Sequence, residues 1–226
     1  GHTRPYAPNS NLMLTLPLDN RSNTRNNLSA RVSADFTILK DLTLKVSGST
    51  DLSNRYFTTY QNNKYGDAQG VSGRSTKEYY KNRSYTFFQT LTYNKAFGDH
   101  NVNVLLGHEN YQFDSNDLWA TRTNYKIDSN ELVAGSVAEG SSSTSDILTQ
   151  EGYFANLSYS FANKYFASAS YRMDGSSRFA TDVRWGGFWS LGASWRLKQE
   201  SFLASVNWVD DLKLKASYGQ QGNSDI

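Results

Sequence analysis

The residues best suited to chemistry in this chain are its histidines and its clustered acidic side chains. His2, His100 and His108 lack the spacing of a paired metal-ligand set such as H-E-x-x-H. Asp114-Ser-Asn-Asp117 offers oxygen ligands without the spacing of a calcium-binding loop. The chain contains no cysteine, which excludes thiolate metal sites, cysteine nucleophiles and disulfides. We therefore predict no metal site and no cofactor.

Two segments rich in glycine and serine resemble catalytic turns only in composition. Asp174-Gly-Ser-Ser lacks the G-x-S-x-G pattern and the strand-to-helix context of a nucleophile elbow. We interpret it as a structural turn in which Asp174 caps backbone N–H groups and pairs with Arg172 or Arg178. The stretch Gly66–Gly73 has no G-K-[ST] sequence and no following helix, so we do not expect it to bind phosphate. The chain is predicted not to be an enzyme.

Aromatic side chains are abundant, and a flat ring can bind a sugar by stacking on its C–H face. The chain has 15 Tyr, 12 Phe and 5 Trp, although only 38% of its residues are hydrophobic. Seven of the aromatic residues fall in stretches that we expect to be long loops. We predict that they contact a ligand or a lid, with packing inside the loops as the alternative role: Tyr56, Tyr60, Tyr65, Tyr79, Tyr80, Trp119 and Tyr125.

Alternation of apolar and polar residues is the pattern that must position these side chains, and it predicts β-strands with two different faces. In the clearest range, Tyr153, Leu157 and Phe161 alternate with polar Asn156 and Ser158. Helical periodicity is limited to a turn or two at residues 199–205. The predicted strands number about eight and cover residues 28–38, 42–49, 84–93, 101–109, 153–161, 165–173, 189–197 and 212–218. Phe88 and Gln89 break the alternation in the third.

The connections between the predicted strands alternate in length. Short turns follow Ile38, Tyr93 and Phe161, and Gly98-Asp99 and Asn163-Lys164 are suitable turn dipeptides. The connection at residues 198–211 lies on the side of the short turns, is longer than the others there and is expected to hold the helical turn. Long polar connections separate the other strands. These long loops are Ser53–Arg83, Asp114–Gln150 and Asp174–Gly187. Short turns at one end and long loops at the other are typical of transmembrane barrels.

Composition and charge narrow the classes of function. Lys and Arg total 23 against 21 Asp and Glu, and this interspersed charge does not indicate a nucleic-acid binder. No run approaches the roughly 20 apolar residues of a transmembrane helix. Aromatic residues near the ends of the apolar faces suit a membrane–water boundary. Taken together, these patterns still fit a secreted carbohydrate-binding sandwich or a small structural or adhesive barrel.

The segment Tyr171–Phe179, followed by Arg184–Phe188 and Trp195–Leu197, resembles a signature of SusC-like (RagA-like) TonB-dependent transporters. The usual form is R-x-D-G-S-S-R-F, then R-W-G-x-F-P-S, then a strand ending in W-R, and Trp189 replaces the usual proline. Order and spacing agree across about residues 28–223. The signature residues, to which we assign structural roles, are Arg172, Asp174, Gly175, Ser176, Ser177, Arg178, Phe179, Arg184, Trp185, Gly186, Trp195, Arg196, Gly219, Gly222 and Asn223.

The resemblance implies an all-β fold, an antiparallel up-and-down transmembrane β-barrel segment with about eight strands of a barrel of about 22. Residues 1–226 are then expected to form part of the barrel domain of a longer chain. The family also has a signal peptide, a TonB-contacting segment and a plug, and none of these is recognisable in this sequence.

The family's activity implies outer-membrane import of a large nutrient, an oligosaccharide or a peptide, driven by the TonB complex. A SusD-like surface lipoprotein is the expected partner, together with outer-membrane lipid and the transported ligand. Five basic residues on the polar faces are expected to face the lumen, where they contact the plug or favour acidic ligands: Lys45, Arg172, Arg196, Lys213 and Lys215.

Overall fold

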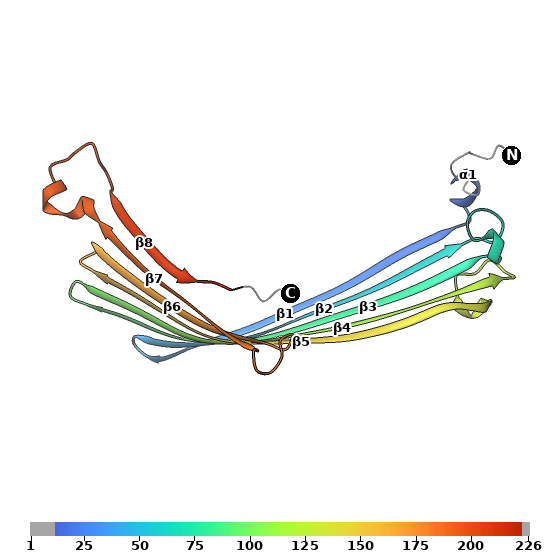
Figure 1. Ribbon diagram of the computed structural model, residues 1–226, viewed down its shortest axis with the longest axis horizontal. Helices are drawn as coiled ribbons and strands as arrows, with labels where there is room; N and C mark the ends of the chain where they lie inside the picture. Colours follow the sequence, from blue (N-terminus) through green and yellow to red (C-terminus); the bar gives the residue numbers. More distant parts are fainter. Residues whose placement is uncertain (1–11, 223–226) are drawn as a thin grey trace. The chain divides into compact units, whose positions relative to one another are not determined.

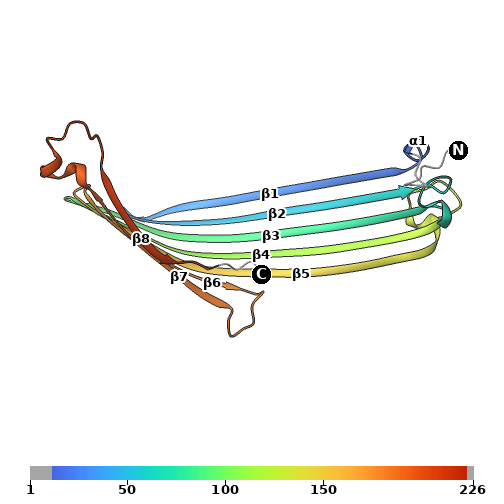
Figure 2. The same cartoon turned by 45° about the horizontal axis from the view of Figure 1, so that its top comes forward.

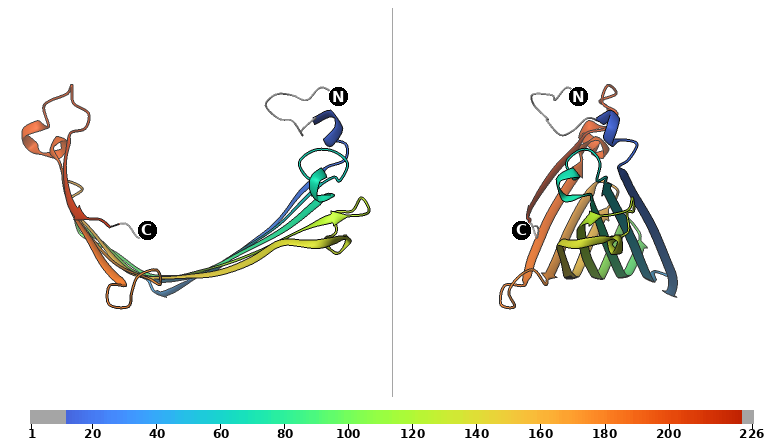
Figure 3. Two further views of the ribbon diagram at one scale, coloured as in Figure 1. Left: turned by 45° about the vertical axis from the view of Figure 1, so that its right-hand side comes forward. Right: turned by 90° about the vertical axis from the view of Figure 1, so that its right-hand side faces the viewer.

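The computed structural model describes residues 12–222 and arranges them as one eight-stranded antiparallel sheet in which each strand pairs with its neighbours in sequence (Figure 1). Figure 2 and Figure 3 show β1 to β8 side by side in this order. The strands are β1 (Asn20–Leu39), β2 (Leu42–Gln61), β3 (Arg74–Phe97), β4 (His100–Tyr125), β5 (Gly135–Phe161), β6 (Tyr165–Ser176), β7 (Trp185–Arg196) and β8 (Lys213–Gln220). The all-β, up-and-down fold predicted from the sequence is confirmed.

Helical segments within residues 12–222 are short and lie in the connections. They are α1 (Leu12–Thr15) and the 3-10 helices η1 (Gln69–Val71), η2 (Leu132–Ala134), η3 (Leu197–Gln199) and η4 (Ser201–Leu203). The last two fall where the helical turn at residues 199–205 was predicted. In the part of the chain that the structure describes, none of these helices has the length and hydropathy to cross a membrane.

The short connections are tight turns, as the sequence predicted. Two residues join β1 to β2 and two join β3 to β4, where Gly98 has a φ of +57°. Between β5 and β6 the positive φ values fall on Ala162 (51°) and Asn163 (55°), so the turn is centred one residue before the predicted Asn163-Lys164 pair. Positive φ at both central residues is typical of the type I′ turn, whose twist matches that of the flanking strands.

The predicted long loops are wrong in extent, because much of each is strand. β2 continues to Gln61 and β3 begins at Arg74, so only residues 62–73 of the expected loop Ser53–Arg83 connect them. Likewise, β4 ends at Tyr125 and β5 begins at Gly135. The loop expected at Asp174–Gly187 shrinks to residues 177–184. These polar segments lack apolar alternation, yet their backbones still pair as strands.

The chain divides into two compact units that cut across β1 to β5. Unit 1 comprises the described residues up to Ser29 with Asp51–Ser84 and Phe113–Ile147, and unit 2 comprises Ala30–Thr50, Tyr85–Gln112 and the described residues from Leu148 onward. Among the described residues, the buried hydrophobic side chains are Tyr60, Ala68 and Tyr125, all of unit 1. Unit 2 therefore shows a sheet with two open faces and no dry interior, unlike a sandwich.

Candidate functional site

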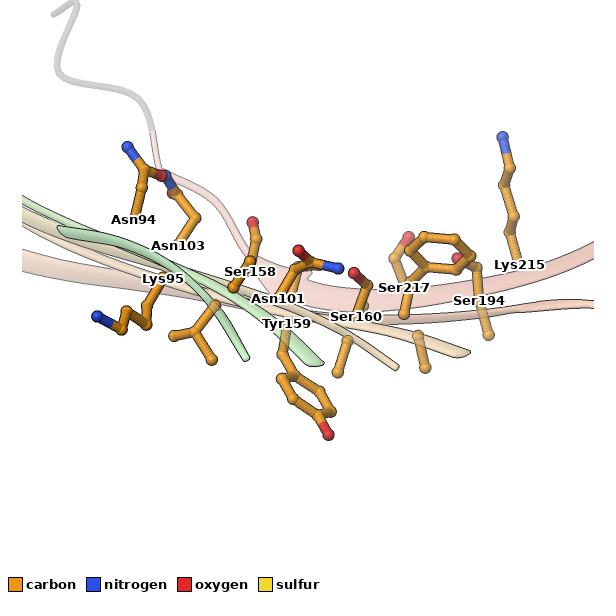
Figure 4. Close-up of a pocket in the computed structure, with 18 of the residues that line it drawn as sticks. Asn94, Lys95, Asn101, Asn103, Ser158, Tyr159, Ser160, Ser194, Lys215 and Ser217 are labelled. Atoms are coloured by element: carbon orange, nitrogen blue, oxygen red, sulfur yellow. The ribbon is translucent and has the colours of Figure 1, made fainter. Parts of the chain in front are cut away.

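Unit 2 presents one polar face and one apolar face, because successive side chains of a strand point to opposite sides. Figure 4 shows Asn101, Ser158 and Lys215 directed to one side of the sheet, and Tyr159 and Lys95 to the other. The register pairs Ser168 with Gly192 and Gly192 with Ser217, so the polar side chains form rows across neighbouring strands.

A hollow of about 860 Å³ lies in unit 2 at the ends of the strands near the short turns. Asn and Ser side chains of β3 to β8 line its polar part, with Lys215 at one side (Figure 4). Asn103 donates a hydrogen bond to Asn94 across the β3–β4 pair. Small polar groups with free hydrogen-bonding capacity make this surface suited to water or to a polar protein segment.

Arg172 is the centre of an ion-pair network on the polar face. Its Nε lies 2.7 Å and 2.8 Å from the two carboxylate oxygens of Asp174, and its Nη2 donates to Glu109 Oε2 at 3.1 Å. The guanidinium carbon lies 5.4 Å from the centroid of the Phe154 ring. Two carboxylates and one ring therefore fix the guanidinium across β4, β5 and β6.

Phe154 lies flat on the polar face because β4 has a glycine beneath it. A Cβ built at Gly107 would meet the Phe154 ring at 2.1 Å, so no larger residue fits there without displacing the ring. Phe88 stacks on the same ring at a centroid distance of 5.7 Å. Phe88 and Gln89 break the apolar–polar alternation of the sequence, but their side chains still point to opposite faces of β3. Phe88 lies on the polar face, and Gln89 lies on the apolar face, 3.4 Å from His108.

A second hollow, of about 790 Å³, gathers much of the predicted signature. Signature residues that line it are Arg172, Asp174, Gly175, Ser176, Phe179, Arg184, Gly186 and Gly222. Asp174 pairs with Arg172, one of the two predicted alternatives. The hydroxyls of Ser176 and Ser177 accept backbone hydrogen bonds from Arg178 N (3.3 Å) and Thr149 N (2.9 Å).

The remaining signature residues have contacts elsewhere in unit 2. The Trp185 ring covers Gly175, where an added Cβ would lie 2.9 Å from the indole. Gly219 of β8 is paired with Ser190 of β7, and a Cβ added at Gly219 would lie 2.7 Å from the Cβ of Ser190. Trp195 belongs to the apolar face, and Arg196 lies with its Nε 3.7 Å from Asp211. Asn223 lies outside the described residues.

The apolar face of unit 2 has an aromatic row at each end. Near the short turns, Phe161, Tyr165 and Trp195 are neighbours, with ring centroids 6.3 Å and 6.1 Å apart. Towards the other end, Tyr153 and Trp185 lie 6.1 Å apart. Trp185 and Trp195 are ten residues apart on β7, which at about 3.3 Å per residue and a tilt near 45° gives about 23 Å of height. This matches the ~25 Å apolar band of a transmembrane barrel.

Two of the seven predicted ligand contacts are enclosed in unit 1. Tyr60 and Tyr125 are 4% and 1% exposed, and their rings pack edge to face at 5.7 Å. They belong to a capped end of the strands, where Asp19 accepts hydrogen bonds from Asn62 N (2.8 Å) and Asn62 Nδ2 (2.7 Å). In this structure their rings are unavailable to a ligand.

The other five predicted contacts do not share one site. Tyr56 and Tyr79 occupy one face of the unit 1 sheet, where Lys77 lies over the Tyr56 ring and Tyr79 donates to Asn54. Tyr80 points to the opposite face and donates to Glu78. Trp119 is on the same face as Tyr80. Thr76, two positions of alternation before Tyr80, hydrogen-bonds Thr121, which shares a face of β4 with Trp119. Tyr65 lies in the loop before η1 and is 45% exposed.

The basic residues expected at the lumen have varied surroundings. Lys213 Nζ lies 4.0 Å and Arg196 Cζ 5.6 Å from the centroid of the Phe166 ring, and Lys215 lines the first hollow. Lys45 is exposed on β2. Sequence reasoning missed Glu109 and Phe154 as partners of Arg172, and the one available signal was Gly107, a glycine within a predicted strand. Among the described residues, no three potential metal ligands group together.

Residues 2–224 match the family of TonB dependent receptor-like β-barrels. The chain belongs to this family. As a TonB-dependent receptor barrel, it is 32% identical over 99% of its length to the TonB-dependent receptor SusC of Bacteroides thetaiotaomicron and covers 22% of that protein. It is 24% identical over 97% of its length to the TonB-dependent receptor P26 of Formosa agariphila and covers 23% of it.

Solved structures agree with this assignment. The structure of the RagAB peptide transporter superposes with a TM-score of 0.86 at 25% identity, over 93% of this chain and 24% of the other. The "open-open" state of the RagAB peptide importer gives 0.85 over the same fractions. The chain thus spans about a quarter of the length of these relatives. The SusC/RagA-like resemblance and the outer-membrane location are confirmed, so the apolar face meets lipid.

Proposed function

We propose that this segment forms wall, lumen surface and extracellular rim of an importer that carries a large nutrient across the outer membrane. The observation that carries the proposal is the two-faced sheet of unit 2. Its apolar face bears two aromatic rows, whose separation matches the height of the apolar band of a transmembrane barrel. Its polar face bears two hollows lined in part by Asn, Ser and charged side chains. A wall of this kind separates lipid from an aqueous passage.

The proposed energy source is the TonB complex, acting on a plug that belongs to the longer protein. Residues 1–226 are proposed to lie wholly within the barrel domain. Lys213, Lys215 and Arg196 lie near the short-turn end, which is the periplasmic end of barrels of this type. Lys215 lines the first hollow, and Arg196 and Lys213 lie over the Phe166 ring beside it. We propose that these cations hold acidic or carbonyl groups of the plug.

The proposed cargo is an oligosaccharide or a peptide, delivered by a SusD-like surface lipoprotein. The similar RagAB structure is that of a peptide transporter, which favours the peptide, and the similarity to SusC keeps the oligosaccharide as an alternative. Among the predicted ligand or lid contacts, we retain the exposed rings of Tyr56, Tyr65, Tyr79 and Trp119 and the partly exposed Tyr80.

Cysteine labelling in the full-length protein tests the proposal, because this segment has no native cysteine. Ser158 and Leu157 are adjacent on β5 and point to opposite faces. In intact cells, Ser158→Cys should react with a small charged thiosulfonate, and Leu157→Cys should not. A bulky adduct at Ser158→Cys should then reduce uptake of labelled peptide or oligosaccharide mixtures severalfold.

The matched comparison is the same cells without TonB activity. Loss of uptake in those cells, together with the block at Ser158→Cys, would support import through this barrel. Uptake that persists without TonB, or that ignores the adduct at position 158, would overturn the proposed function. Equal labelling at positions 157 and 158 would overturn the assignment of the two faces.

A further inference from the structure

The aromatic row near the short turns is longer than the three residues of β5 to β7. Within unit 2 it begins at Phe97 on β3, whose ring lies 5.1 Å from that of His100 on β4. His100 in turn lies 4.7 Å from Phe161 on β5. We call Phe97, His100, Phe161, Tyr165 and Trp195 the short-turn belt. It crosses five consecutive strands at the level where the apolar face ends.

The belt continues beyond the sheet into the connection between β7 and β8. Phe202, in η4, packs edge to face on Trp195 with ring centroids 6.5 Å apart. The connection, residues 197–212, leaves the end of β7 and returns to β8 (Figure 1, Figure 3). We call it the β7–β8 turn. It is the longest of the connections at the short-turn end in the described chain.

Glu200 ties the β7–β8 turn to the belt. Its carboxylate accepts hydrogen bonds from the hydroxyl of Tyr165 (2.6 Å) and the indole N–H of Trp195 (3.0 Å), and Lys164 Nζ lies 3.3 Å away. Both aromatic donors are belt residues. Since the polar edge of each ring is engaged by Glu200, the turn is held beside the row of rings.

A lysine closes the β7–β8 turn on itself. Lys198 Nζ donates to the carbonyl oxygens of Val206 (2.6 Å) and Leu203 (3.3 Å). Backbone bonds from Leu203 N to Glu200 O and from Val206 N to Leu203 O add to this closure. The turn is therefore an ordered platform in which the positions of its side chains are defined.

This platform exposes large aromatic side chains. Trp208 is 87% exposed and Phe202 is 63% exposed. Exposed rings of this size are costly in water, whereas Trp and Phe beside a lipid-facing belt find their preferred place in the headgroup region of a bilayer. Phe202, packed on Trp195, extends the apolar face of unit 2 into the turn.

We propose that the β7–β8 turn is a membrane-interface anchor, in which Phe202 and Trp208 enter the headgroup layer of the periplasmic phospholipid leaflet. The anchor fixes the height of the barrel wall in the bilayer at a point where β7 and β8 end. This role requires the outer-membrane location and does not depend on import or on the nature of the cargo.

Spin-label accessibility in the full-length protein, reconstituted in phospholipid nanodiscs, tests the anchor. Single nitroxides are attached at Trp208→Cys and Phe202→Cys, with Ser205→Cys as the control on an exposed polar position of the same turn. Collision with lipid-soluble oxygen should exceed collision with a water-soluble nickel chelate at 202 and 208, and the order should reverse at 205. A greater effect of the nickel chelate at 208 would overturn the proposal.

Protection of position 208 from both reagents would also overturn it, because another protein surface would then cover the turn. A second measurement avoids the label. Bilayers of phospholipids brominated near the headgroup should quench more fluorescence in the wild-type protein than in Trp208→Phe. Equal quenchable fluorescence in the two proteins would place the indole away from lipid and contradict the anchor.

Discussion

Glycine positions on the polar face decide where large rings can lie. Gly107 is the clearest case, because the Phe154 ring fills the space that a Cβ would need. Phe88 stacks on the ring, and Arg172 covers it at 5.4 Å. One missing side chain on β4 therefore lets an aromatic pair and a charged network share the same small area.

We expect Gly107→Ala to destabilise the full-length barrel by about 1–3 kcal/mol, the usual cost of overpacking a well-filled site. The ring cannot move aside freely, since Phe88 and Arg172 hold it. The midpoint of chemical unfolding in lipid vesicles measures the effect. Gly48→Ala is the matched control, because nothing lies within 4 Å of a Cβ at Gly48. The double variant with Phe154→Leu should recover most of the loss, and equal effects at 107 and 48 would contradict this account.

The β5–β6 turn holds an alanine in a conformation that suits glycine better. Ala162 has a φ of 51°, where an ordinary L residue loses about 1 kcal/mol or more. We expect Ala162→Gly to raise the unfolding free energy by about 0.5 kcal/mol, after the larger entropy of the unfolded chain is counted. Asn163→Gly should give a smaller gain, because asparagine tolerates this region. Chemical unfolding of the two variants in lipid vesicles measures both changes in the free energy of unfolding. A larger gain for Asn163→Gly would contradict the expectation.

At the scale of elements, apolar alternation located all eight strands and both faces, because lipid on one side selects every second residue. It located the strand ends poorly. Residues 135–147 are mostly small and polar, so the sequence predicted a loop there, although they lie in β5. The pairing of backbones, which a single strand's sequence does not encode, extends these strands. For the same reason the seven predicted ligand contacts were placed on loops, whereas most lie on paired strands.

The β7–β8 turn should respond to acid through Glu200. A hydrogen bond from Tyr165, then one from Trp195, and the charge of Lys164 lower the pKa of this carboxyl below its usual value of 4.5. A lowered pKa means that the attachment is fully present above the ordinary carboxyl pKa and is lost as the pH falls through the lowered value. Hydrogen exchange of residues 197–212 should therefore accelerate as the pH falls below the ordinary carboxyl pKa.

The Glu200→Gln variant removes the charge at every pH. Its turn should exchange faster at neutral pH than the wild-type turn, and the acid-dependent step should disappear. Gln199→Ala is the neighbouring control, since it leaves the hydrogen bonds of Glu200 in place. An acid-dependent step that survives in Glu200→Gln would show that another group titrates.

At the scale of the whole molecule, β1 and β8 are the edges of the sheet within the described residues. An unpaired strand edge exposes a row of N–H and C=O groups, which a bilayer cannot hydrate. Unit 2 also has no enclosed apolar interior that would hold it together in water. Both facts indicate that the segment obtains its stability from barrel strands that close the sheet.

We therefore expect residues 1–226, produced alone, to show no cooperative thermal transition as a monomer in plain buffer. The same residues within the full-length barrel should be resistant to protease in detergent. Circular dichroism with analytical ultracentrifugation checks the first expectation. A sharp melt of a monomeric species would mean that the edges are protected by contacts within the segment.

The strand lengths have a consequence for the cell surface. β2, β3, β4 and β5 contain 20, 24, 26 and 27 residues, whereas about 9–11 residues suffice to cross a bilayer. About half of β2, and more than half of β3, β4 and β5, are therefore not needed to cross the bilayer. Antibodies and bacteriophages that approach from outside meet paired strands, whose side chains can change without loss of the backbone ladder. Such a surface can vary its epitopes while its strands remain paired.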